Sequence, residues 1–340
     1  MMTVCAFGFP LGSFASSLTL NFTADDDTRW AYRSLFCTKY GFLGVATIFC
    51  FFMPESPWWL IERGDERAAG KALHKLGVGP GEMAKRLAIM RFTLAQVREE
   101  TSGVTYMECF RLSNLRRTMI SIAPVAFQAF TGITFINAYF TYYAQLAGYS
   151  TSGSFRLQVV QQALSMVGNI ISWFLVDRMG RRSLTLWGFV GTLITHCIAA
   201  GLGIHSGASS IKGVIAMQLL FVWIYNVTIG STGVTLLAEV STPRLRAKTV
   251  AMGMFVLNIL CMVVSFVIPF LFNPDKLNLG AKTMFIFASL VLLASVAVWA
   301  FVPETAGRSF EELDEMFIKR VPARKFKTYQ TQVETRALGV

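Results

Sequence analysis

Charged residues are scarce in this sequence. Of its 340 residues, 15% are Asp, Glu, Lys or Arg, whereas 54% are hydrophobic and 29 are Phe. A soluble domain carries roughly 25% charged residues. So few charges cannot cover a water-facing surface, which excludes an ordinary soluble protein and predicts lipid as the solvent.

Residues that bind metals or perform acid–base chemistry are also few. The six cysteines form no Cys-x-x-Cys pair, and the three histidines are His74, His196 and His205. This pattern predicts no metal, no cofactor and no disulfide framework. A membrane enzyme is disfavoured as well, because no His, Asp or Glu cluster stands beside an apolar run at catalytic spacing.

Long apolar runs are what the sequence has in abundance. Eight of them approach or exceed the roughly 20 residues that a helix needs to cross a bilayer. They are 1–22, 34–53, 118–146, 156–176, 184–205, 214–238, 249–272 and 283–302. The first is weakened by Pro10 and several Ser, but it lacks the basic start of a cleaved signal. None alternates as barrel strands do, so the sequence predicts an all-α polytopic membrane protein with about eight transmembrane helices.

The basic residues gather on one side of the predicted membrane. If the eight helices alternate, one face carries residues 54–117, 177–183, 239–248 and 303–340, which hold 24 of the 31 Lys and Arg residues. The positive-inside rule places this face and both termini in the cytoplasm. Because topology explains the charge of +11, nucleic-acid binding is not predicted. The basic cluster at 319–327 is expected either to contact anionic lipid or to remain solvated.

Two helices end in the same signature, which indicates an internal repeat. Run 34–53 is followed by Pro54-Glu55-Ser56, and run 283–302 by Pro303-Glu304-Thr305. Duplicated halves are common in transporters. Six helices separate the signatures and only two precede the first. About four helices are therefore expected to be missing from the N-terminus, and the chain is not expected to transport by itself.

The only long polar stretch lies between the two signatures. Within it, residues 64–76 and 82–100 are expected to form amphipathic helices, the first starting near Asp65 and ending at Gly77. Residues 310–317 predict a further acidic helix in the tail. The expected organisation is 1–53 as the last two helices of an N-terminal half, 54–117 as a cytoplasmic helical linker, 118–302 as a six-helix C-terminal half, and 303–340 as a cytoplasmic tail.

Five motifs carry a family resemblance. They are Pro54-Glu55-Ser56-Pro57-Trp58-Trp59-Leu60, Gln128 to Gly132 with Tyr142-Tyr143, Asp177-Arg178-Met179-Gly180-Arg181-Arg182, Glu239 to Arg246, and Pro303-Glu304-Thr305-Ala306-Gly307-Arg308. In order and spacing they resemble the sugar porter family of the major facilitator superfamily, from about residue 4 onward. Trp58, the segment 29–33 and the tail segment 321–327 are similar to fungal maltose and other α-glucoside:proton permeases. The resemblance implies a partial major facilitator fold.

It also implies a function. The expectation is transport of a neutral sugar, an α-glucoside such as maltose, by alternating access in the plasma membrane, coupled to protons in the full-length protein. The alternative is a sugar-porter-like membrane protein that does not transport, such as a sensor or an inactive truncated product. The expected partners are the lipid bilayer, a small neutral sugar and protons. Because no Asp or Glu lies in the eight runs, the proton-carrying acid is expected among the missing helices.

Neutral amides are the candidate substrate-binding residues. Amides donate and accept hydrogen bonds, which suits a neutral polyhydroxyl ligand. The resemblance points to Gln128, and depth in the membrane points to Asn137, Asn169 and Asn258. The alternative for each is hydrogen bonding between helices. Ala129 and Thr134 stand where the family has Gln and Asn, which argues against glucose-like binding.

Charged residues at the cytoplasmic helix ends form a second candidate site. In the family such residues make a network when the inner gate is shut, and the expected members here are Glu55, Asp177, Arg181, Arg182, Glu239, Arg246 and Glu304. Exposed ion pairs contribute only about 0–1 kcal/mol each. A network that forms only when the inner gate is shut is nevertheless expected to bias the equilibrium between two states. The alternative is that these charges only set the topology.

Overall fold

The computed structural model describes residues 7–25, 28–101, 103–204, 207–272, 276–277, 279–326 and 328–329. His205 and the last basic residue of the 319–327 cluster lie outside them. Every regular element in this described part of the chain is a helix. The predicted all-α class is confirmed.

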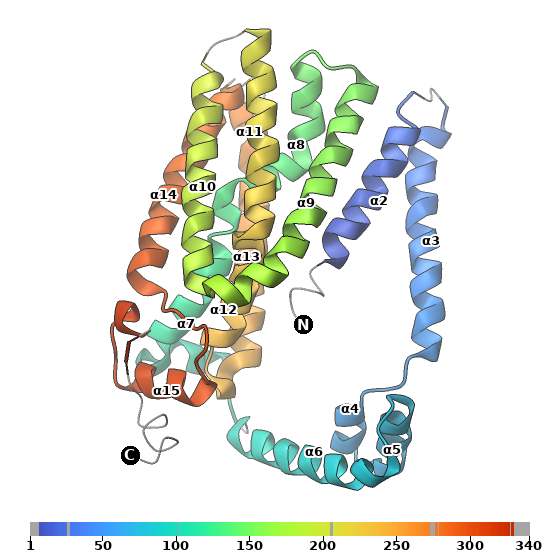
Figure 1. Cartoon of the computed structure of the whole chain (residues 1–340), viewed down its shortest axis with the longest axis vertical. Helices are drawn as coiled ribbons and strands as arrows, with labels where there is room; N and C mark the ends of the chain where they lie inside the picture. Colours follow the sequence, from blue (N-terminus) through green and yellow to red (C-terminus); the bar gives the residue numbers. More distant parts are fainter. Residues whose placement is uncertain are drawn as a thin grey trace. The chain divides into compact units, whose positions relative to one another are not determined.

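Each predicted apolar run forms a helix or a pair of helices. They are α2 (Gly8–Phe22), α3 (Trp30–Phe52), α7 (Leu112–Ala126) with α8 (Ile133–Leu146), α9 (Thr151–Met179), α10 (Arg181–Leu202), α11 (Ala208–Val227) with α12 (Ile229–Val240), α13 (Arg246–Phe272) and α14 (Thr283–Phe301) (Figure 1). Over the described residues, 7 of these stretches are long and apolar enough to cross a membrane. The exception is α2, which has 15 described residues.

Two of the spans are interrupted. A short 3-10 helix, η2 (Ala129–Thr131), separates α7 from α8 and is followed by Gly132, whose φ is 75°. Only glycine adopts this left-handed conformation without strain, and a Cβ there would lie 3.0 Å from the Phe287 ring. Between α11 and α12, Thr228 has non-helical dihedrals of −119° and −87°. Such breaks release backbone carbonyls at membrane depth, and these need other partners.

The chain forms two compact units. The first combines Met1–Ser34 with Met107–Val340, and the second is Leu35–Tyr106. The second unit holds most of α3 and three polar helices, α4 (Pro57–Glu62), α5 (Glu66–Lys75) and α6 (Pro80–Thr101). As expected from the sequence, Asp65 caps α5, accepting a hydrogen bond from the Ala68 backbone N–H at 2.9 Å.

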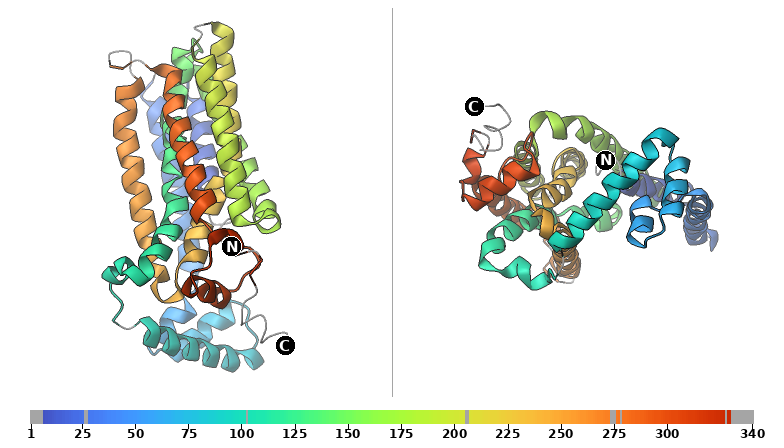
Figure 2. Two further views of the ribbon diagram at one scale, coloured as in Figure 1. Left: turned by 90° about the vertical axis from the view of Figure 1, so that its left-hand side faces the viewer. Right: turned by 90° about the horizontal axis from the view of Figure 1, so that it is seen from below.

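The first unit contains the helices that position the candidate sites. Within it α10 and α14 run side by side (Figures 1 and 2), and α2 packs against α9. Its interior contains a large apolar cluster in which Phe135, Phe140, Phe221 and Phe287 are all buried. The outer faces of these helices keep large apolar side chains exposed. Such faces are costly in water, so they are expected to face lipid.

The tail forms a small structure of its own. Helix α15 (Phe310–Ile318) begins with a capping box in which Ser309 and Glu312 satisfy each other's backbone N–H groups. The short 3-10 helix η5 (Ala323–Lys325) follows. Leu313, Met316, Val321 and Phe326 form a buried apolar cluster. The predicted acidic helix is therefore present, and the chain after it folds back onto its apolar face.

Candidate functional site

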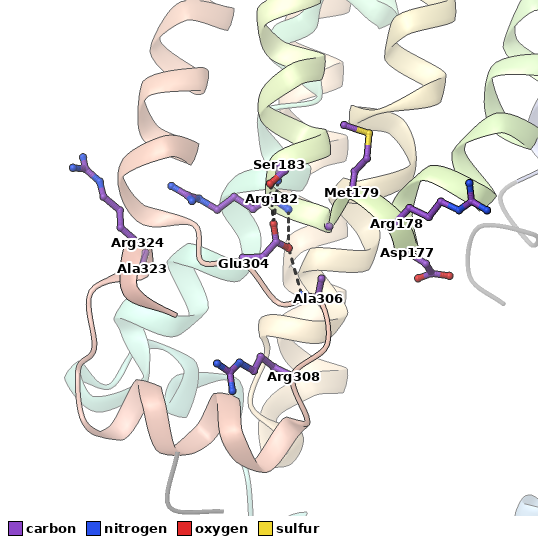
Figure 3. Close-up of a pocket in the computed structure, with 11 residues that line it drawn as sticks. Asp177, Arg178, Met179, Arg182, Ser183, Glu304, Ala306, Arg308, Ala323 and Arg324 are labelled. Carbon is purple, nitrogen blue, oxygen red and sulfur yellow. Dashed lines mark hydrogen bonds between the residues drawn. The ribbon is translucent and has the colours of Figure 1, made fainter. Parts of the chain in front are cut away.

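Glu304 caps the start of α10 (Figure 3). Its carboxylate accepts hydrogen bonds from the backbone N–H groups of Arg181 at 2.9 Å, Arg182 at 3.3 Å and Ser183 at 3.2 Å. The first N–H groups of a helix lack partners within it and carry the positive end of its dipole, so a carboxylate stabilises them. Gly180 makes the approach possible, because a Cβ at that position would lie 2.8 Å from the carboxylate.

Arg181 joins two further carboxylates. Its Nε lies 3.2 Å from Oε1 of Glu239, and its Nη2 lies 3.1 Å from Oδ1 of Asp177. The Glu239 pair is partly buried, whereas the Asp177 side chain is 77% exposed. Water screens an exposed pair, so the Glu239 contact is the stronger one. The Thr305 hydroxyl donates to the second oxygen of Glu239 at 2.6 Å. Together these contacts connect α10, α12 and the segment after α14.

The side chains of the other predicted members are not part of these contacts. Arg182 donates from Nη2 to the Trp299 carbonyl at 2.8 Å. Arg246 is the first residue of α13. Glu55 is exposed and belongs to the second unit. The structure therefore brings together Asp177, Arg181, Glu239 and Glu304, with Arg182 next to them.

Sequence reasoning missed Arg117, a buried cation at the start of α7. Its guanidinium forms an ion pair with Asp314 of α15 and donates from Nε to the Val240 carbonyl at 2.6 Å. It also lies 4.8 Å from the centre of the Phe317 ring. A buried charge needs such partners. Arg117 thus ties α7, the end of α12 and the tail helix together, and no local motif announces a pair 197 residues apart.

An uncharged cavity of about 480 Å³ lies between α2, α8 and α9. Its lining comprises Gly8, Phe9, Gly12, Ser13, Ser16, Ser17 and Leu20 of α2, Asn137 of α8, and Gln158 and Gln162 of α9. Asn137 is the one predicted substrate-binding residue in this lining. The serines and both glutamines were missed, although Ser13, Ser16 and Ser17 recur at the helical spacing that predicts one polar face.

Hydrogen bonds orient the amides of this cavity. Gln161 donates from Nε2 to Oδ1 of Asn137 at 3.1 Å, which joins α9 to α8. The Thr141 hydroxyl donates to Oε1 of Gln158 at 2.9 Å. Each amide oxygen is thereby directed toward its donor. Asn137 and Gln158 are therefore held in defined orientations in the cavity wall.

The remaining three predicted amides do not line this cavity. Gln128 is 6% exposed and donates from Nε2 to the Ile229 carbonyl at 2.8 Å, at the break between α11 and α12. Asn169 is buried and accepts from the Trp173 indole N–H at 3.2 Å. Asn258 is exposed and donates to the Met254 carbonyl at 2.7 Å. In this conformation Gln128 makes an interhelical contact, and the substrate role of all three stays a prediction.

The described residues contain no group of three or more His, Cys, Asp or Glu side chains placed to hold a metal ion. Tightly bound metals in proteins require several such ligands at once.

Known proteins similar to this chain are sugar permeases. Maltose permease MAL31 of Saccharomyces cerevisiae is 33% identical over 82% of this chain and 46% of its own length. The general alpha-glucoside permease of the same yeast is 28% identical over 92% of this chain and 52% of its own length. The chain thus spans about half the length of the curated relatives it matches.

Solved structures show the same fold. The major facilitator proton:xylose symporter XylE bound to 6-bromo-6-deoxy-D-glucose is similar with a TM-score of 0.71 and 20% identity, covering 93% of this chain and 66% of that chain. The inward-open form of XylE from E. coli gives a TM-score of 0.73 at 19% identity, covering 91% and 63%. The predicted partial major facilitator fold is confirmed. Residues 2–317 also match the family model described as sugar (and other) transporter, and the chain belongs to that family.

Proposed function

We propose that this chain takes part in moving a neutral sugar across a membrane. The observation that carries the proposal is the uncharged cavity between α2, α8 and α9, which three serine hydroxyls and three amides line. Hydroxyls and amides both donate and accept hydrogen bonds, as sugar hydroxyls do. An ionic substrate would leave its charge unpaired there. The exposed Phe9 ring adds an apolar surface for the less polar face of a sugar.

The proposed substrate is an α-glucoside such as maltose. The names of the yeast relatives, maltose permease and general alpha-glucoside permease, support this class. The cavity of about 480 Å³ is within the size range of small-molecule sites. Ala129, at a position where the sugar porter family has Gln, is fully buried and offers no polar group to a glucose-like ligand.

Alternating access is the proposed mechanism, and the charged cluster has a defined part in it. The Arg181–Glu239 pair, the Thr305 hydroxyl and the Glu304 cap all join elements of the first unit. They hold the ends of α10, α12 and α14 together, so that these helices move as one body. Removing one contact shifts the populations of the two access states only by the amount to which that contact is stronger in one of them.

The orientation in the membrane and the coupling to protons are part of the proposal. We place both termini in the cytoplasm of a plasma-membrane protein, because 24 of the 31 Lys and Arg residues lie on that side. Proton coupling is proposed by analogy with XylE, described as a proton:xylose symporter. The test is maltose uptake at several external pH values in yeast that lacks its own α-glucoside permeases.

A binding experiment tests the site separately from transport. Labelled maltose is titrated onto the purified chain in lipid nanodiscs, with Asn137→Ala as the cavity variant. Gln145→Ala is the matched control, because it removes an exposed amide from the same helix α8 outside the cavity. Binding that only Asn137→Ala weakens supports the site. Absence of maltose binding by the unaltered chain contradicts the proposed function. Binding without uptake supports the alternative of a sugar-porter-like protein that does not transport, either a sensor or an inactive truncated product.

A further inference from the structure

Four arginine residues line a second cavity, at the start of α10 and the end of α14 (Figure 3). The cavity measures about 300 Å³. Arg178, Arg182, Arg308 and Arg324 belong to its lining, together with the carboxylate residues Asp177 and Glu304. Cationic residues therefore outnumber anionic residues in its lining.

Both carboxylates are engaged elsewhere. Glu304 attracts Arg182 through space, but its oxygens accept hydrogen bonds from three backbone N–H groups and the Ser183 hydroxyl. Asp177 pairs with Arg181 and is 77% exposed to solvent. Arg308 has its own partners, in the carbonyls of Phe326 and Tyr329. Arg178 is exposed, so water screens its charge. Arg182 and Arg324 are the two cations that lie against α14.

These two guanidiniums converge on Trp299. Arg182 donates to the Trp299 carbonyl at 2.8 Å, a neutral acceptor, and its Nε has no hydrogen-bond partner among the described residues. The guanidinium carbon of Arg324 lies 3.6 Å from the centre of the Trp299 ring. Arg182 and Arg324 are close enough for their charges to repel. An anion between them would reduce this repulsion, in addition to the attraction that Glu304 exerts on Arg182.

The cavity stands where a membrane surface is expected. Trp299 lies in the last turn of α14 and is 50% exposed, and Phe301 beside it is exposed as well. Tryptophan is enriched at the boundary between hydrocarbon and water. Arginine recognises phosphate through two parallel hydrogen bonds, which lysine cannot make. The groups facing the cavity thus match a phosphate at head-group depth.

We propose that Arg182 and Arg324 bind a phosphate group in this cavity. A phospholipid head group and a soluble phosphate share this chemistry, and the position of Trp299 favours the head group. The bound phosphate links η5 of the tail to α10 and α14. Within the basic cluster after α15, Arg324 then has a specific role because it lines the cavity, whereas Lys325 does not line it; both residues are exposed.

Native mass spectrometry of the purified chain in detergent tests the proposal. Phosphatidylinositol and phosphatidylcholine of equal chain length are titrated onto the unaltered chain, Arg324→Gln and Lys325→Gln. The last variant is the matched control, because it removes the same charge from the next residue of η5. The expected result is one tightly retained anionic lipid, bound about tenfold more weakly by Arg324→Gln than by Lys325→Gln, a difference of about 1.4 kcal/mol.

Two further arms identify the source and check the fold. Displacement of the lipid by millimolar inorganic phosphate would assign the site to soluble phosphate, and failure to displace it would assign the site to the head group. Arg324→Lys keeps the charge but not the planar guanidinium. Its lipid affinity is therefore expected to lie between those of Arg324→Gln and Lys325→Gln, with an unchanged melting temperature in phosphatidylcholine. Equal lipid affinity of Arg324→Gln and Lys325→Gln would overturn the proposal, leaving only general surface charge.

Discussion

Asp314→Asn tests whether the buried Arg117 holds the tail helix in place. The Arg117 side chain is 9% exposed and that of Asp314 is 34% exposed. A hydrogen bond to a charged group contributes about 1.5–3 kcal/mol. We expect the low end, about 1.5 kcal/mol, because Asp314 is one-third exposed and Asn keeps one acceptor oxygen. Opening of α15 should therefore become about 12-fold more frequent.

Amide hydrogen exchange of the purified protein in detergent measures this opening directly. The matched control is Glu315→Gln, which makes the same change on the same helix. Glu315 pairs with the more exposed Lys319 one turn away, and such pairs contribute about 0.2–0.5 kcal/mol, or roughly a twofold change. If α15 exchanges no faster in Asp314→Asn than in Glu315→Gln, burial of Arg117 does not strengthen the pair and the reasoning is refuted.

Three further predictions concern the cap, the helix break and the cavity. Glu304→Gln should lower the free energy of unfolding by about 0.5–2 kcal/mol, because it weakens the α10 cap. The change should be seen as a lower melting temperature, and an unchanged melting temperature argues against capping. Gly132→Ala should lower the free energy of unfolding by more than about 1 kcal/mol. Residue 132 has a φ of 75°, and the Phe287 ring would lie 3.0 Å from the new Cβ. Asn137→Ala should weaken maltose binding roughly 2- to 12-fold, whereas Gln145→Ala should leave it unchanged.

The membrane helices were predictable because run length is a direct consequence of bilayer thickness. The breaks within them were not. Gly132 sits inside an apolar run and is an ordinary residue for a membrane helix, so only its φ of 75° reveals the interruption. The break at Thr228 carries no proline, and the Ile229 carbonyl beside it is held by Gln128 from a distant helix. Tertiary contacts of this kind leave no local pattern.

The candidate sites were predictable in part. Motif resemblance identified Asp177, Arg181, Glu239 and Glu304, which the structure brings together, although their roles stay predictions. It did not indicate that Glu304 binds backbone N–H groups, since a carboxylate motif does not specify its partner. The serines of α2 weakened the first apolar run in the sequence and line the uncharged cavity in the structure. These serines line a cavity only because α2 packs near α8 and α9, which lie more than 100 residues further along the chain.

The short segment after α14 has a consequence for chain register. Two adjacent residues, Glu304 and Thr305, serve different helices: the first binds the start of α10 and the second binds Glu239 of α12. Three residues later, Arg308 binds the Phe326 and Tyr329 carbonyls of the tail. One inserted or deleted residue before Glu304 would displace all three side chains at once. The number of residues in this segment is therefore constrained more tightly than their identity. A conservative substitution at one position disturbs only one contact, whereas a change of length disturbs all three.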